Sequence, residues 1–164
     1  MRNMSLVYLV SQFEVMLQKF IQCSLEERPE SLSSSRTLTV NELQKCREIG
    51  QAVQTVIEKE VTSVLQEDID RIDHYLEQKR GIAISSFSEW RQFRERFYRR
   101  NVIVHNSAMI NQTYRQKVGY SDKDIALDVD EQYLIESVTV FQQVAQRLAL
   151  HFKKTQKRNK HDGN

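Results

Sequence analysis

The chain has 164 residues, of which 40% are apolar and 28% are charged, an ordinary composition for a single globular domain. Four glycines and one proline are too few for a turn-rich β protein, so the composition predicts an all-α fold. The net charge of +2 does not by itself indicate a nucleic-acid binder, and the isolated Cys23 and Cys46 indicate neither a zinc site nor a disulfide framework.

The first predicted element is a helix over residues 3–24, because apolar residues recur there at steps of three and four. Polar residues from Gln12 onward interrupt the N-terminal apolar run, so no signal peptide is expected. The sequence also lacks the stretch of about 18 apolar residues that a membrane span needs. With two unpaired thiols, these features predict a cytoplasmic protein that does not contact a membrane.

Two further helices are predicted after a polar loop over residues 31–39. One covers residues 41–65, with Asn41 as its N-cap. Its predicted apolar stripe is Leu43, Cys46, Ile49, Val53, Ile57, Val61, Val64 and Leu65. The next helix follows a kink near residues 67–68 and is predicted to end at Gly81, after a basic last turn.

A fourth helix is predicted to begin at residues 86–89, whose S-x-x-E spacing is typical of a capping box. Its predicted buried face consists of Trp90, Phe93, Phe97, Asn101, Val104 and Ala108. This stripe is apolar except for Asn101, which makes that position a candidate for a function beyond packing. After Ala108 the helical period is lost, and residues 125–127 are expected to form a short extended piece.

The last predicted helix begins after Asp128 or Asp130, either of which can cap it. Its predicted apolar stripe is Leu134, Val138, Phe141, Ala145, Leu148 and Phe152. Residues 1–152 are therefore predicted to form a single-domain bundle of about five helices. The run of basic residues that begins at Lys153 predicts a disordered tail over residues 153–164.

Positive charge is concentrated in the predicted fourth helix, where residues 91–100 include five arginines and one glutamate. A guanidinium group donates two parallel hydrogen bonds to phosphate oxygens, so this stripe favours a nucleic-acid partner. Charge alone leaves open the alternative of a solvated helix face that binds no ligand.

His105 lies four residues after Asn101, so the two share one face of the helix. Imidazole is the side chain best suited to proton transfer near neutral pH, although a lone histidine on an apolar face is also typical of a core residue. Arg100 is rotated by about 140° from His105 on an ideal helix. The two can meet if the long arginine wraps round, if the helix is distorted, or if a second copy of the chain supplies one of them.

The segment Arg-Asn-Val-Ile-Val-His over residues 100–105 resembles the R-x4-H signature of HEPN domains (higher eukaryote and prokaryote nucleotide-binding). The polar residue directly after the arginine, and Asn106, Asn111 and Tyr114 downstream, are also similar to the family pattern. The resemblance covers about residues 6–152 and is closest over residues 90–114. Ala108 departs from it, because many relatives have glycine there.

The resemblance implies an all-α, HEPN-like fold and a metal-independent RNA endonuclease that works as a homodimer without a cofactor. Arg100, Asn101 and His105 would form the catalytic group, with His105 as general acid or base and Arg100 stabilising charge on the phosphate. The residues predicted to contact RNA are Arg96, Arg99, Asn106 and Tyr114. Asn106 could equally cap the helix, and a tyrosine in the position of Tyr114 is more typical of packing.

A toxin or antiviral defence effector is the biological setting that such an enzyme suggests, and an antitoxin or other inhibitory protein would then be a partner. Two alternatives stay open at this stage. One is a non-catalytic HEPN domain that dimerises or binds a nucleotide or a partner. The other is an unrelated helical interaction module in which the short motif occurs by chance.

Overall fold

The structure is a computed structural model that describes the backbone of residues 1–33 and 36–161, and the side chains of residues 1–33 and 36–153. The described chain is all-helical, which confirms the predicted fold class. Its α-helices are α1 (Arg2–Glu27), α2 (Val40–Lys45), α3 (Ile49–Leu65), α4 (Ile69–Arg80), α5 (Trp90–His105), α6 (Gln112–Val118) and α7 (Glu131–His161). Two 3-10 turns, Pro29–Ser31 and Ile84–Ser86, complete the described elements.

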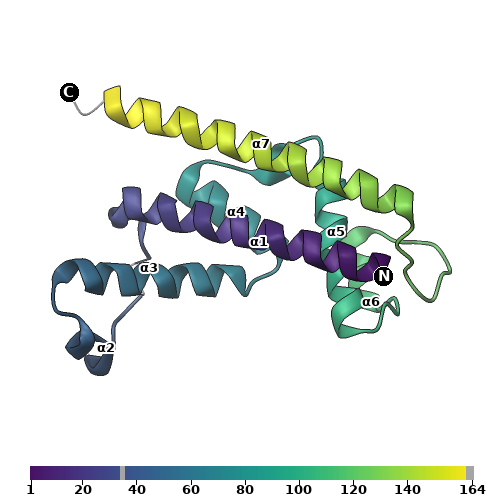
Figure 1. Cartoon of the computed structure of the whole chain (residues 1–164), viewed down its shortest axis with the longest axis horizontal. Helices are drawn as coiled ribbons and strands as arrows, with labels where there is room; N and C mark the ends of the chain where they lie inside the picture. The colour runs from purple at the N-terminus through teal and green to yellow at the C-terminus, as the bar shows by residue number, and fades with distance from the viewer. Residues whose placement is uncertain (34–35, 162–164) are drawn as a thin grey trace.

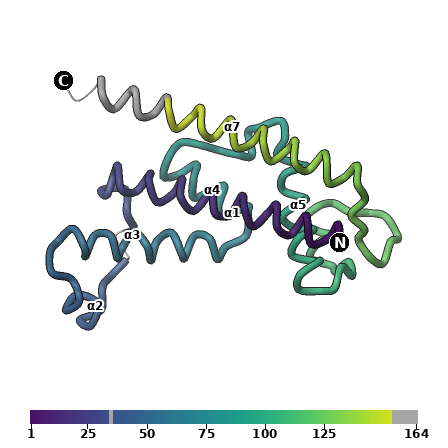
Figure 2. The backbone as a smooth tube through the Cα atoms, viewed as in Figure 1, coloured from purple at the N-terminus to yellow at the C-terminus, as the bar shows by residue number. Residues whose placement is uncertain are grey.

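Helix α1 is the centre of the bundle and contacts α3, α5 and α7 (Figure 1). Helix α7 runs in the same direction as α1, whereas α3 runs in the opposite direction on the other side of α1 (Figure 1). Helix α5 crosses these helices and carries α6 at its C-terminal end. The short α2 lies at the outer end of α3, away from α5 and α6 (Figure 2).

Four phenylalanines join α1, α5 and α7 at the middle of the core. Phe13, Phe93, Phe97 and Phe141 are buried, and every pair of their ring centroids is between 5.0 and 6.2 Å apart. Tilted and edge-to-face aromatic pairs each add about 0.5–1.5 kcal/mol to the stabilisation that burial alone supplies. The cluster therefore holds α5, which carries the predicted site, in a defined position against α1.

The helix predicted over residues 41–65 is two helices. Thr39, not Asn41, is the N-cap of α2, because its side chain accepts from the Glu42 N–H while the Glu42 carboxylate accepts from the Thr39 N–H. The chain is not helical between Cys46 and Glu48. Leu43 and Ile49, both expected in the buried stripe, are exposed.

Helix α5 begins at Trp90, later than predicted, and the capping box predicted at residues 86–89 does not form. Ser86 belongs to a 3-10 turn, and the Glu89 carboxylate lies 3.1 Å from Arg147 of α7. The C-terminal half of the predicted buried face is also wrong. Val104 is 49% exposed and Val102 is buried in its place, while Ala108 lies beyond the helix end at His105.

Helix α6 has no counterpart among the predicted elements, although its caps are typical. The Asn111 side chain accepts from the Tyr114 N–H, and Gly119 ends the helix with a φ of 71°. The short extended piece expected over residues 125–127 is present, because Ala126 pairs with Met109 in an isolated antiparallel bridge.

Asp130 caps the start of α7, as one of the two predicted alternatives, because its carboxylate accepts from the Tyr133 N–H at 2.7 Å. Val140 and Val144 are buried on this helix, whereas Val138, expected in the core, is exposed. For the tail predicted to be disordered over residues 153–164, the backbone continues α7 to His161, and residues 162–164 lie outside the described part. None of the described helices combines the length and the apolar character needed to cross a bilayer.

Candidate functional site

A pocket of about 480 Å³ lies where α5 meets α1, the start of α4, and α6. Arg100, Asn101 and His105, the three residues predicted to be catalytic, all line it. Its other lining residues are Glu14, Leu65, Gln66, Glu67, Asp68, Ile69, Ile72, Phe97, Tyr98, Val102, Asn111, Thr113, Tyr114 and Lys117. The pocket thus combines apolar side chains from the core with charged and amide groups.

The positions of the three predicted catalytic residues follow from the place of each on α5. His105 is the last helical residue and is exposed, so the interpretation as a core histidine is wrong. Asn101, one turn earlier, is half-buried. The long Arg100 side chain reaches the same pocket, so one chain brings all three residues to a common space without help from a second copy.

Arg100 is held by α1. Its guanidinium Nη2 forms an ion pair and hydrogen bond with Oε1 of Glu14, and its side chain is only 18% exposed. Burial lowers the pKa of Arg100, because the charged form loses hydration inside the protein. The Nε–H is buried and has no acceptor in the described part of the chain. An unsatisfied buried donor costs about 1–3 kcal/mol.

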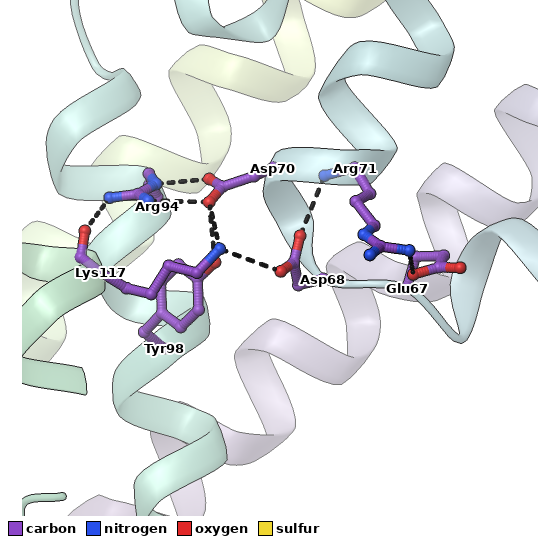
Figure 3. Close-up of polar contacts among 7 residues, drawn as sticks. All are labelled: Glu67, Asp68, Asp70, Arg71, Arg94, Tyr98 and Lys117. Carbon is purple, nitrogen blue, oxygen red and sulfur yellow. Dashed lines mark hydrogen bonds and ion pairs between the residues drawn. The ribbon is translucent and has the colours of Figure 1, made fainter. Parts of the chain in front are cut away.

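Beside the pocket, Asp70 ties α4 to α5 and α6 (Figure 3). Its carboxylate accepts from both Nε and Nη2 of Arg94, from the Tyr98 hydroxyl at 2.9 Å, and from Lys117 Nζ at 3.2 Å. Burial opposes ionisation of Asp70, but these hydrogen bonds outweigh it and lower its pKa to about 2. The network therefore fixes one wall of the pocket as long as Asp70 is ionised.

Lys117 extends this network to the pocket itself. Its Nζ lies 3.3 Å from Oδ2 of Asp68, the N-cap of α4, and both residues line the pocket (Figure 3). The hydrogen bond with Asp70 is the main cause that raises the pKa of Lys117. Lys117 thus stays charged at neutral pH, although its charge is already neutralised by these carboxylates.

Two of the predicted RNA-binding residues are engaged inside the protein. Arg96 is 3% exposed and donates to Ser137 Oγ and to the backbone oxygen of Gln92. Arg99 donates to Glu95 at 2.7 Å and to the Asp128 backbone oxygen. Neither lines the pocket that holds Arg100. Their geometry therefore supports a packing role and gives no support for contact with phosphate.

Asn106 and Tyr114 also have structural roles. The Asn106 side-chain amide donates to the Met109 backbone oxygen, so it closes the turn after α5. Tyr114 is 1% exposed and its hydroxyl donates to Glu95 at 2.5 Å. Burial, followed by the charge of Glu95, raises the pKa of Tyr114. Of these two residues, only Tyr114 reaches the pocket wall.

The turn after His105 is left-handed at two consecutive residues that are not glycine. Ser107 has a φ of 49° and Ala108 a φ of 64°. A residue with a Cβ atom pays a steric cost in this region, which glycine avoids. This geometry gives the physical reason why glycine would suit position 108, where the chain departs from the HEPN pattern.

Glu14 is the site residue that the sequence interpretation missed. Its signal is local: it lies four residues after Val10 and three before Leu17, both fully buried on α1. A lone carboxylate beside an apolar stripe is as informative as Asn101 is on α5. Lys117 and Asp68 gave no comparable signal, because the sequence did not predict α6 and so did not predict their proximity.

No protein-family model, curated protein or solved structure matches this chain. The resemblance to HEPN domains therefore rests on the motif at residues 100–105 and its neighbours. Among the described residues, no group of three or more His, Cys, Asp or Glu side chains is placed to hold a metal ion.

Proposed function

We propose that this protein is an RNA endonuclease of the HEPN type, with Arg100, Asn101 and His105 as its reacting group. The observation that carries the proposal is that these three side chains line one pocket of about 480 Å³ in a single chain. The pocket size is typical of small-ligand sites and leaves room for one nucleotide of a strand. The alternative of a chance motif would not require the three residues to share a pocket.

The chemistry needs only proton transfer and charge stabilisation, so it can proceed without a metal. The ribose 2′-oxygen loses its proton and attacks phosphorus, and the bond from phosphorus to the 5′-oxygen then breaks as that oxygen gains a proton. His105 is the imidazole for one of these proton transfers. Arg100 stabilises the negative charge that builds up on the phosphate, and Asn101 orients it. The products carry a 2′,3′-cyclic phosphate and a 5′-hydroxyl.

One feature of Arg100 and one of its neighbouring arginines bear on its role. Its buried Nε–H has no acceptor in the described part of the chain, and a phosphate oxygen could satisfy it only if the Arg100 side chain turned toward the pocket. Arg96 and Arg99 are engaged elsewhere, so few arginines of α5 are available for the strand. The affinity for RNA should accordingly fall less steeply with salt concentration than it would if all five arginines contacted phosphates.

A homodimer is part of the proposal, because three exposed apolar residues lie at the end of α5 and in the paired segments that follow His105. Val104 precedes it on α5, and Met109 and Ile125 lie on the two paired segments of the turn that follows. A second copy that covers them would bring a second His105 toward the first and exclude water from the site. The two free thiols, Cys23 and Cys46, are compatible with the reducing cytoplasm that the proposal assumes.

The proposal is tested by incubating the protein with a panel of RNAs in EDTA and reading the chemistry of the new ends. We expect 2′,3′-cyclic phosphate ends. His105→Ala should slow cleavage by roughly 10²- to 10⁴-fold, because the proton-transfer group is lost. Arg100→Lys should also slow it, because lysine keeps the charge but not the planar fork. His74→Ala, an exposed position on α4 outside the pocket, is the matched control and should cut at the wild-type rate.

The second candidate is a module that binds a nucleotide or a partner without cutting RNA. The pocket favours it to the extent that its volume suits a mononucleotide. Under this alternative the wild-type protein leaves every RNA intact in EDTA, yet a nucleotide binds and His105→Ala weakens that binding. Such a result would replace the nuclease proposal.

A further inference from the structure

In the described part of the chain, the Glu14 carboxylate contacts Arg100. It lies on α1, its side chain is 31% exposed, and it lines the pocket together with Arg100 and His105. No second hydrogen bond or ion pair to the Glu14 carboxylate occurs within the described residues. A partly exposed carboxylate in contact with a single cation can accept a proton from a ligand.

We infer that Glu14 is the general base of the site and that His105 is the general acid. The inference rests on the proposed RNA cleavage, for which the motif alone leaves the role of His105 open. A phosphate that hydrogen-bonds to the Arg100 guanidinium lies next to Glu14, because the two side chains are in direct contact. The ribose 2′-hydroxyl adjoining that phosphate is then within reach of the carboxylate.

The proton transfers balance with these two residues alone. Glu14 takes the proton of the 2′-hydroxyl as the bond from the 2′-oxygen to phosphorus forms. His105, in its protonated form, gives a proton to the 5′-oxygen as the bond from phosphorus to that oxygen breaks. An in-line displacement needs a base and an acid on opposite sides of phosphorus, and the pocket can supply them from two elements, Glu14 from α1 and His105 from the end of α5.

The surrounding charges allow Glu14 to act next to an anionic phosphate. Arg100 offsets the repulsion between the Glu14 carboxylate and the phosphate. Of the other carboxylates that line the pocket, Asp68 is paired with Lys117 and Glu67 with Arg71. Glu14 is therefore the lining carboxylate whose partner is also the proposed phosphate ligand, and the others are held by groups that the reaction does not use.

The test separates base from acid with a substrate whose leaving 5′-oxygen is replaced by sulfur, since a thiolate leaves without a proton. On ordinary RNA, Glu14→Gln and His105→Ala should each slow cleavage by roughly 10²- to 10⁴-fold. On the sulfur substrate, His105→Ala should recover most of the lost rate and Glu14→Gln should recover none. Glu14→Asp keeps the carboxylate on a shorter stem and should retain part of the rate on both substrates.

A binding measurement and a control variant test whether Glu14 has a merely structural role. Binding to an RNA with a 2′-deoxy sugar at the cleavage site, which cannot react, should be as tight for Glu14→Gln as for the wild type, or tighter. Glu26→Gln, an exposed position on the same helix, is the matched control and should change neither rate nor binding.

Several outcomes would overturn the inference. One is a Glu14→Gln protein that cuts RNA at the wild-type rate. Another is a sulfur substrate that restores the rate of Glu14→Gln and not that of His105→Ala. Weak binding of the unreactive RNA by Glu14→Gln, with a lowered melting temperature, would show that Glu14 only positions Arg100. A wild-type protein that cuts no RNA contradicts the proposed function as well, whereas a normal wild type beside a fully active Glu14→Gln contradicts this inference alone.

Discussion

The methyl group of Ala108 destabilises the left-handed backbone conformation that this residue adopts. Ala108 has a φ of 64°, a region in which an L-residue with a Cβ costs about 1–2 kcal/mol. Glycine avoids this cost but loses about 0.5–1 kcal/mol through its greater freedom in the unfolded chain. We expect Ala108→Gly to raise the free energy of unfolding by up to about 1 kcal/mol, measured by urea denaturation.

The matched control for this substitution is Ala149→Gly. Ala149 is an exposed helical position in α7, where the same change should lower the free energy of unfolding by about 1 kcal/mol. A free energy of unfolding that rises for Ala108→Gly and falls for Ala149→Gly would establish that the backbone at position 108 is left-handed in solution. Equal losses at both positions would contradict this.

Asp70 makes the stability of the fold depend on acid pH. Its pKa of about 2 lies below the ordinary value of 3.8, so its contribution to the free energy of unfolding is fully present above about pH 4. That contribution is lost as the pH falls from about 4 through 2, because the carboxylate is then protonated in the folded chain as well. Asp70→Asn should therefore be less stable than the wild type at pH 7, and the difference should narrow at pH 3.

Urea denaturation of both proteins at the two pH values checks this prediction. Asp122→Asn, at an exposed loop position, is the control and should show no such narrowing. If the free energies of unfolding of the wild type and Asp70→Asn differ by the same amount at pH 7 and pH 3, the Asp70 hydrogen bonds do not depend on its charge.

At the scale of the helix, the arginines of α5 join it to its neighbours. Arg94 reaches α4 and Arg96 reaches α7, through Asp70 and Ser137 respectively. Arg96→Ala should lower the free energy of unfolding by about 2–3 kcal/mol, because a buried hydrogen-bonded network is broken. Arg91→Ala, at an exposed position of the same helix, should change it by about 0.5 kcal/mol or less.

Thermal or urea unfolding measures both arginine variants. An Arg96→Ala protein of wild-type stability that binds RNA more weakly would restore the earlier prediction that this arginine contacts phosphate. Loss of stability without a change in RNA affinity per folded molecule would support its packing role.

Two segments with the same capping spacing behave differently, which shows the limit of local signals for an element. Thr39 and Glu42 cap α2 reciprocally, whereas Ser86 and Glu89 do not cap α5. Glu89 instead contacts Arg147, which is 58 residues away in the sequence. The S-x-x-E spacing is therefore not sufficient for a capping box, because Ser86 Oγ donates to the Ala83 backbone oxygen and Glu89 pairs with Arg147.

At the scale of the whole molecule, the proposed dimer predicts a defined contact face. Val104→Asp would place a charge among apolar residues next to His105, so it should convert a dimer to a monomer and reduce RNA cleavage. Light scattering should give twice the chain mass of 19.4 kDa for the wild type and the single mass for the variant. Ile49→Asp, an exposed apolar position at the start of α3, is the control and should remain a dimer.

A wild-type mass of one chain would contradict the homodimer while leaving the pocket intact, since Arg100, Asn101 and His105 already share it in one chain. If such a monomer cleaves RNA, the pocket of a single chain is sufficient for the reaction. A dimer for both variants would place the contact face elsewhere.

The sequence by itself determined the features that depend on neighbours a few residues away. The helical period of α1 and α7, the glycine that ends α4 and the aspartate that caps α7 are of this kind, because each reflects contacts within one or two turns. The motif at residues 100–105 likewise marked three residues that do share a pocket. The short α6 was not predicted, and neither was the break between α2 and α3, because a few residues carry too little helical period to show where a helix begins or ends.

Only the tertiary structure decided which charges remain available for a ligand. Arg100 meets Glu14 across 86 residues of sequence, and Arg96 meets Ser137 across 41. Five arginines on one helix look equivalent in the sequence, yet packing buries Arg96 against α7 and leaves Arg91 exposed. The physical reason is that an ion pair depends on the distance between side chains in space, and that distance is set only when the helices pack.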